Sequence, residues 1–151
     1  MTPLTEHFTL EELTRSDKAK LLDIVNTPAP AIVANLRRLA RFNELVRLEL
    51  GGAAMTISSG YRCPALNRAV GGASNSAHLD GLACDFIAPA FGTPLAICLA
   101  LEKSYLQFDQ LIIERVGGAV WVHLGIAAEG KTPRRQLLTI DNRGTRVGLW
   151  N

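Results

Sequence analysis

The sequence lacks the features that mark several large classes of protein. No apolar run approaches the roughly 20 residues that a membrane-spanning helix requires. The N-terminus has no basic stretch followed by an apolar segment, which is the pattern of a secretory signal peptide. We therefore expect a protein that is made in the cytoplasm without a signal peptide and is not inserted into a membrane.

The chain also has few cysteines and a small net charge. The 3 cysteines are odd in number and lack the spacing of a zinc ribbon or a disulfide scaffold, so reduced, buried thiols are the simplest interpretation. A net charge of +2 neither requires nor excludes a polyanionic partner. Arginine-rich segments between Leu10 and Leu50 raise the alternative of a helix-turn-helix regulator. None of them has the pattern of a recognition helix, and no nucleic-acid partner is expected.

The residues that are present predict one domain with an α+β fold. With 151 residues, 48% of them hydrophobic, and no internal repeat, the chain fits a single domain over residues 1–151, and we expect a monomer. Capping patterns and apolar periodicity predict helices at about 10–16, 30–50, 64–70 and 94–105. Strands are predicted at 55–58, 83–87, 108–114 and 120–126, and a polar tail with Leu137 to Ile140 closes the chain. We expect the helices to pack on one side of a small antiparallel sheet and to leave a cleft on the other.

The most distinctive chemistry lies between Ser76 and Asp85, and again at His123. A catalytic Zn²⁺ ion is usually held by three side chains of the histidine and carboxylate type, with a fourth position left for water. His78, Asp85 and His123 meet that requirement. Gly81 permits a left-handed turn, which can fold the segment carrying His78 back on the strand carrying Asp85.

Asp85 is expected on an otherwise apolar strand, where it needs a partner. Burial of an unpaired carboxylate is costly, and a metal ion is one of the few groups that can neutralise it. The alternative is that Asp85 pairs with an arginine and that His78 is a surface histidine in a loop. The local residues leave both interpretations open.

Two strand-like runs flank Gly117 and Gly118 and predict a β-hairpin. In that register residue 114 faces 121 and residue 112 faces 123, so Glu114 is the diagonal neighbour of His123, with Cα atoms roughly 7 to 8 Å apart. Glu114 is then the candidate general base, because hydrolytic metal sites need a carboxylate to take the proton of the attacking water. The alternative is a cross-strand pair between Glu114 and Arg115 or another arginine.

Taken in order, several motifs resemble one family. They are Ser59-Gly60-Tyr61-Arg62, Asn67, Gly71-Gly72, Ser76 to Asp85, and Trp121 to His123. This series resembles the zinc D-Ala-D-Ala carboxypeptidase and L-alanyl-D-glutamate endopeptidase superfamily, peptidase family M15, and within it the small single-domain branch of bacteriophages and prophages. The resemblance covers nearly the whole chain. It implies a Hedgehog/D,D-peptidase-like fold and one Zn²⁺ ion held by His78, Asp85 and His123.

The resemblance also implies a role for Arg62. A guanidinium near the metal can stabilise the charge of a tetrahedral intermediate or hold the substrate carboxylate, whereas the alternative is an ordinary surface ion pair. Ser76 is a candidate for orienting His78 or for hydrogen-bonding the substrate, or else it is a turn-forming serine. Asp80 and Asp109 are weaker candidates, and we expect both to be solvated carboxylates.

The chain departs from the related D,D-dipeptidases at one position. They carry the catalytic glutamate three positions before the second histidine, where this chain has Val120. The expected function is nevertheless that of a zinc metallopeptidase acting on peptidoglycan stem peptides, of the D-Ala-D-Ala carboxypeptidase or L-Ala-D-Glu endopeptidase type. A phage or prophage lysin, released or delivered to the cell wall by another protein, fits this sequence. The alternative is a non-catalytic zinc domain that binds the wall or another protein.

Overall fold

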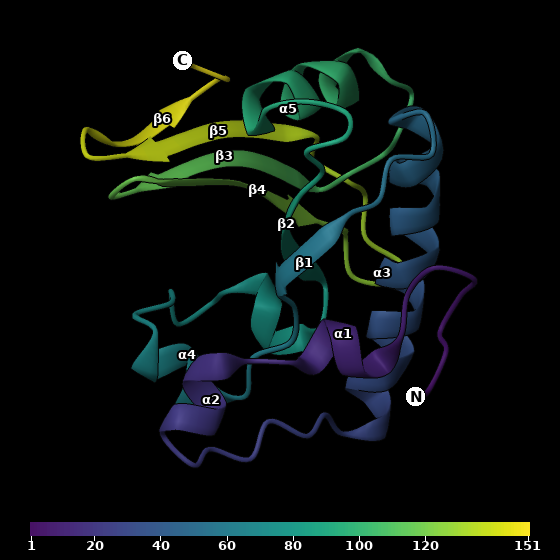
Figure 1. Cartoon of the computed structure of the whole chain (residues 1–151), viewed down its shortest axis with the longest axis vertical. Helices are drawn as coiled ribbons and strands as arrows, with labels where there is room; N and C mark the ends of the chain where they lie inside the picture. The colour runs from purple at the N-terminus through teal and green to yellow at the C-terminus, as the bar shows by residue number, and fades with distance from the viewer.

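A six-stranded sheet forms the centre of the computed structural model, which describes residues 1–151 (Figure 1). Its strands are β1 (Thr56–Ser59), β2 (Ala83–Ile87), β3 (Gln110–Val116), β4 (Ala119–Gly125), β5 (Gln136–Asp141) and β6 (Gly144–Val147). They lie side by side in the order β1-β2-β4-β3-β5-β6. All neighbouring pairs are antiparallel except β3 and β5, which are parallel.

The helices begin where the sequence supplies suitable first residues. α1 (Leu10–Thr14) and α2 (Asp17–Leu21) follow Thr9 and Ser16, whose hydroxyl oxygens accept a backbone N–H of the first turn. α3 (Pro30–Glu49), α4 (Pro64–Ala69) and α5 (Pro94–Lys103) each start with proline. The backbone N–H groups of the first turn have no hydrogen-bond partner within a helix, so proline, which lacks an N–H, costs no hydrogen bond there. A short 3₁₀ helix, η1 (Ala77–Asp80), precedes β2. None of the helices is long and apolar enough to cross a membrane.

The hydrophobic core lies on one face of the sheet. Because side chains alternate along a strand, Cys84, Leu111 and Val122 point to the same side of β2, β3 and β4. There they join apolar residues of the two longest helices, such as Leu39 of α3 and Ile97 of α5. Figure 1 shows α5 lying over β3 and β4, which it contacts.

The opposite face of the sheet is only partly covered. Asp85, Ile112 and His123 point away from the core and line a cleft of about 920 Å³. α4, the loop that follows it and the segment around Ser16 form the facing wall. Figure 1 shows α2 and α4 on the side of the sheet away from α5. The predicted cleft is therefore present, although two short helices lie across it rather than on the core side.

The α+β class is confirmed, but the two C-terminal strands and one short helix differ from the predictions. The segment from Leu137 to Ile140 lies in β5, which pairs with β3, and β6 follows it, so the chain does not end in a polar tail. The sheet is consequently not wholly antiparallel. β4 ends beside the start of β3, and the loop after Gly125 crosses to the other side of β3, so β5 must run parallel to it. The five-residue α2 was not predicted, since it is too short to show helical periodicity.

The two outer strands of the sheet are short. β1 and β6 each have 4 residues. The pairing of β1 with β2 is interrupted by an irregularity between Ile57 and Ser59. Nη2 of Arg15, just after α1, donates a hydrogen bond to the Ile57 carbonyl oxygen at 3.4 Å. One edge of the sheet is therefore partly closed by the segment that follows α1.

Candidate metal centre

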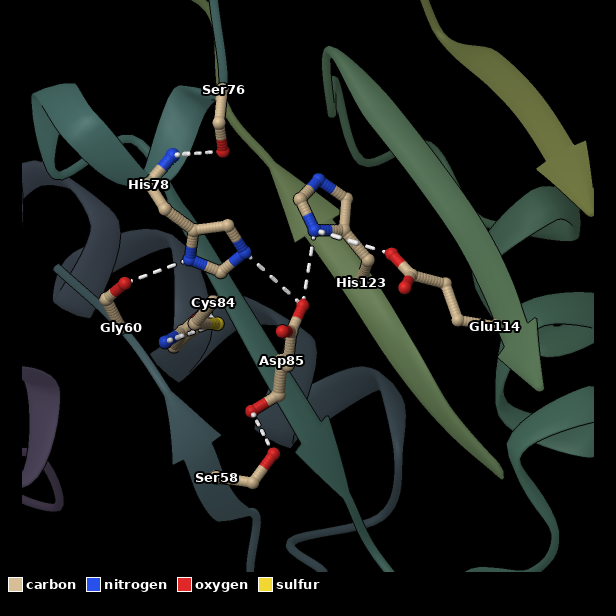
Figure 2. Close-up of polar contacts among 9 residues, drawn as sticks. Ser58, Gly60, Ser76, His78, Cys84, Asp85, Glu114 and His123 are labelled. Carbon is tan, nitrogen blue, oxygen red and sulfur yellow. Dashed lines mark hydrogen bonds and ion pairs between the residues drawn. The ribbon is translucent and has the colours of Figure 1, made fainter. Parts of the chain in front are cut away.

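Three elements bring the predicted ligands together. Asp85 on β2 lies directly opposite His123 on β4, and His78 lies on η1, immediately before β2. Gly81 ends η1 with φ of +67°, the left-handed turn that the sequence predicts there. Figure 2 shows the three side chains pointing toward one another. Their ligand atoms all lie within 4.8 Å of one another.

The ring of His78 is oriented by the backbone. Its Nδ1 donates to the carbonyl oxygen of Gly60 at 2.7 Å, which leaves Nε2 to face the cluster. The backbone N–H of Arg62 donates to the His78 carbonyl at 3.1 Å and joins the two motifs. A Cβ at residue 60 would overlap the Leu13 carbonyl, which accepts the N–H of Tyr61 at 2.8 Å. The close approach of these segments therefore requires glycine at position 60.

The three ligand atoms fit a cation. Because Nδ1 of His78 carries the proton donated to Gly60, its Nε2 presents a lone pair to Oδ1 of Asp85, 3.3 Å away. Nδ1 of His123 lies 3.0 Å from the same oxygen. The three side chains are only 2%, 13% and 8% exposed for His78, Asp85 and His123, so little water reaches the space between them. Two imidazoles and one carboxylate are a typical donor set for mononuclear zinc.

The protonation states of the cluster suit metal binding. Burial lowers the pKa of His78, which favours the neutral imidazole that binds metal ions. Burial alone would raise the pKa of Asp85, but the adjacent His78 and His123 outweigh it and hold that pKa well below its usual range. His78 therefore offers a lone pair and Asp85 a negative charge at neutral pH.

Glu114 lies beside the cluster. The hairpin has the predicted register, with Ile112 opposite His123 and Glu114 diagonal to it. Oε1 of Glu114 is 3.9 Å from Nδ1 of His123, and the side chain is 21% exposed. Burial and the charge of Asp85 raise the pKa of Glu114, while His123 and Arg62 partly oppose the increase. Glu114 makes no ion pair with an arginine, so the alternative of a cross-strand pair with Arg115 does not hold.

Arg62 and Ser76 both line the cleft. Nε of Arg62 is buried and has no hydrogen-bond partner, and its charge acts on both Asp85 and Glu114. Arg62 is thus not part of a surface ion pair. Oγ of Ser76 accepts the backbone N–H of His78 at 3.3 Å and caps η1 (Figure 2). A serine that orients His78 and a turn-forming serine would both make this contact, so the two interpretations of Ser76 stay open.

The two weaker candidates occupy different positions. Asp80 is exposed at the end of η1 and does not line the cleft. Asp109 does line the cleft, but its carboxylate accepts four hydrogen bonds from Arg134. The expectation of a solvated carboxylate is therefore wrong for Asp109. Asp109 and Arg134 are 25 residues apart in the sequence, which explains why sequence reasoning missed this pair.

Sequence reasoning also missed a polar contact behind the cluster. Asn43 of α3 is fully buried, and its Nδ2 lies 3.6 Å from Sγ of Cys84. Figure 2 shows Cys84 on the opposite side of β2 from the ligands, so it is not a ligand. Burial raises the pKa of Cys84 to about 12, and the group stays a thiol. An asparagine within the apolar stripe of the 30–50 helix was the available signal.

Three converging ligand atoms in a cleft, with a separate carboxylate beside them, are the arrangement of a mononuclear metal-dependent hydrolase. The family model described as Peptidase M15 matches residues 6–123, which include every predicted site residue. The match covers more than half of the chain, and the protein belongs to the Peptidase M15 family. No curated protein matches the sequence.

Proposed function

We propose that the protein is a zinc metallopeptidase that hydrolyses peptide bonds in peptidoglycan stem peptides. The observation that carries the proposal is the convergence of His78, Asp85 and His123 next to the Glu114 carboxylate, in one cleft. Membership of a peptidase family supports peptide-bond hydrolysis. The order of the sequence motifs supports a cell-wall substrate and a phage or prophage lysin that reaches the wall through another protein.

The ligand set assigns one atom of each side chain to the metal. Nε2 of His78, Oδ1 of Asp85 and Nδ1 of His123 would hold a zinc ion, since these are the atoms that face one another. When bound, zinc supplies Lewis-acid chemistry, which polarises a carbonyl group and makes a water molecule easier to deprotonate. The Gly60 carbonyl keeps the lone pair of His78 on Nε2, because it accepts the proton on Nδ1.

Glu114 is the proposed general base. Its carboxylate lies next to the cluster without being one of the three converging ligands, so it can take the proton of the attacking water and pass it to the leaving amine. Its raised pKa strengthens it as a proton acceptor once it is ionised. The strand geometry explains why Val120 is no obstacle. Residue 120 points to the opposite face of β4 from His123, whereas Glu114 on β3 shares the face of His123.

Arg62 is the proposed electrophilic group. Its guanidinium lines the same cleft, where burial lowers the pKa of Arg62 and the nearby charges of Asp85 and Glu114 partly oppose that effect. A fixed cation there can stabilise negative charge that develops on the carbonyl oxygen of the scissile bond. Arg62 forms no direct ion pair, which supports this role, because no carboxylate of the protein neutralises its charge at contact distance.

The second candidate function is a non-catalytic zinc domain that binds the wall, favoured by the absence of a glutamate at position 120. Incubation of the zinc-loaded protein with purified muropeptides, followed by mass spectrometry, separates the two. A peptidase produces two fragments whose summed mass exceeds that of the intact muropeptide by one water. Their individual masses identify the bond that is cut, and a chelator prevents their formation. Zinc-loaded Glu114→Gln is the matched control. Wild-type protein that binds zinc but leaves every muropeptide intact would establish the non-catalytic alternative.

A further inference from the structure

The cleft continues on both sides of the metal cluster. His123 and its partner Ile112 occupy the middle of the sheet face. Toward the hairpin turn the cleft is lined by Trp121 and Ile140, and toward the other end of β3 it is lined by Asp109. A cleft with space on both sides accommodates a peptide that passes through the site, and its two ends can each bind part of the chain.

Arg134 is held at the Asp109 end of the cleft. Its Nε donates to both carboxylate oxygens of Asp109, at 3.1 and 3.2 Å, and its Nη2 donates to Oδ2 at 2.8 Å. Its backbone N–H also donates to Oδ1 at 3.1 Å. The Arg134 side chain is nevertheless 58% exposed, and Nη1 takes part in none of these bonds. The guanidinium is thus fixed on one edge and free on the other.

The next residue fixes the backbone of this segment. Arg135 has φ of +48°, which is unfavourable for a residue with a Cβ. Its guanidinium compensates by donating to the carbonyl oxygens of Leu106 and Ser104, at 3.1 and 3.0 Å, and by stacking 4.6 Å from the centre of the Phe108 ring. Strained backbone that is held in this way is typical of functional sites. Arg135 anchors the chain, and Arg134 is presented to the cleft.

We propose that Arg134 binds a carboxylate of the substrate, and that Asp109 is the positioning residue that holds it. The free edge of a fixed guanidinium matches the two oxygens of a carboxylate. Asp109 lies three positions before Ile112, which faces His123, so at roughly 3.3 Å per residue the backbone of Asp109 is on the order of 10 Å along the sheet from the metal cluster. A carboxylate that Arg134 binds beside Asp109 would therefore lie a few residues of the substrate away from the scissile bond.

This inference rests on the proposed function and names a feature of its substrate. Stem peptides carry carboxylates in two places, at the C-terminus and as branches along the chain, and both have the required chemistry. Arg134 lies beyond residue 123, where the family match ends, so the family match does not include it. We assign to Arg134 a role in selecting among acidic stem peptides, and this role is separate from the hydrolytic step.

The test uses three forms of one synthetic stem peptide: all carboxylates free, the branch carboxylate amidated, and the C-terminal carboxylate amidated. Values of kcat and KM are measured for the wild type and for Arg134→Gln. Arg143→Gln is the matched control, because Arg143 is exposed and lies outside the cleft. Loss of a charge-assisted contact should raise KM for the free peptide about tenfold to a hundredfold with little change in kcat.

Wild-type protein should also bind one amidated peptide worse than the free one, and Arg134→Gln should not distinguish the two. The amidated form that shows this effect tells whether the carboxylate is terminal or a branch. Asp109→Asn should raise KM in the same direction, because it releases the guanidinium. An equal change on all three peptides, or no change on any, overturns the proposal.

The two proposals fail in different ways. Cleavage of any peptide by the wild type supports the peptidase function whatever Arg134 does. Binding measured by calorimetry on zinc-loaded Glu114→Gln, with and without Arg134→Gln, tests the carboxylate contact without turnover. If free and amidated peptides bind Glu114→Gln with equal affinity, Arg134 does not recognise a carboxylate.

Discussion

Replacement of Gly60 by alanine should weaken zinc binding although residue 60 provides no ligand. The new Cβ would lie 2.8 Å from the Leu13 carbonyl carbon and closer still to its oxygen. Leu13 is fully buried, and its carbonyl accepts the N–H of Tyr61, so α1 cannot move away without opening the core. The backbone at residue 60 must therefore shift, and its carbonyl must move away from Nδ1 of His78.

The magnitude has two parts. Overpacking of this kind typically costs about 1 to 3 kcal/mol of stability, even without metal. Loss of the hydrogen bond that orients a ligating histidine typically costs about tenfold to a hundredfold in metal affinity. That factor corresponds to a further loss of about 1.4 to 2.7 kcal/mol in the free energy of unfolding when the free zinc concentration is well above the Kd of both proteins. The variant should thus lose more stability with zinc than without it.

Thermal unfolding with and without zinc, together with zinc affinity from competition with a chromogenic chelator, measures both parts. Gly118→Ala is the control, because a Cβ there meets no atom within 4 Å. We expect its effect on stability to stay within about 0.5 kcal/mol and its zinc affinity to equal that of the wild type. A folded Gly60→Ala protein with wild-type zinc affinity would refute the reasoning that the Gly60 carbonyl holds His78.

Four further predictions concern the site and the thiols. Alanine at any one of the three ligands should remove most of the bound zinc, as measured by metal analysis; about one equivalent of zinc in the folded variants would contradict the ligand set, which is His78, Asp85 and His123. Glu114→Gln should keep its zinc and lose about 10² to 10⁴ in kcat, whereas wild-type kcat would exclude Glu114 as the base. Because Glu114 acts when deprotonated and its pKa is raised, activity should fall as pH drops through a value above the ordinary glutamate pKa. Arg62→Gln should move that limb of the pH profile to higher pH, since Arg62 lowers the pKa of Glu114. A limb that does not move would show that Arg62 does not act on the pKa of Glu114. Burial raises the pKa of both Cys84 and Cys98 to about 12, so at neutral pH a thiol reagent should modify only Cys63 in the folded protein.

The parts of the site that the sequence could predict are those set by local geometry. The paired glycines at 117 and 118 set the hairpin register, and the two-residue period of a strand then placed Glu114 and His123 on one face. The same period separated Asp85 from Cys84 on β2. These placements depend on neighbours within a few residues, which is why a single sequence contains them.

The features that could not be predicted depend on distant or unspecific partners. The residues of β5 form a strand because they pair with β3, and nothing near Leu137 indicates a parallel partner 26 residues earlier. The hydrogen bond to His78 comes from a backbone carbonyl, a group that every residue carries, so the identity of Gly60 gave only the space for it. The pair of Asp109 and Arg134 likewise forms only after the loop following β4 returns to the start of β3.

The short outer strands bear on how copies of this protein behave together. Exposed strand edges are templates on which a second chain can add by backbone hydrogen bonding. Here β6 offers only 4 residues, and β1 offers 4 residues with an irregular register and one carbonyl already taken by Arg15. Edge-to-edge aggregation is therefore disfavoured in the folded protein. Local opening of the segment that follows α1 would release the Ile57 carbonyl and add one free acceptor to this edge.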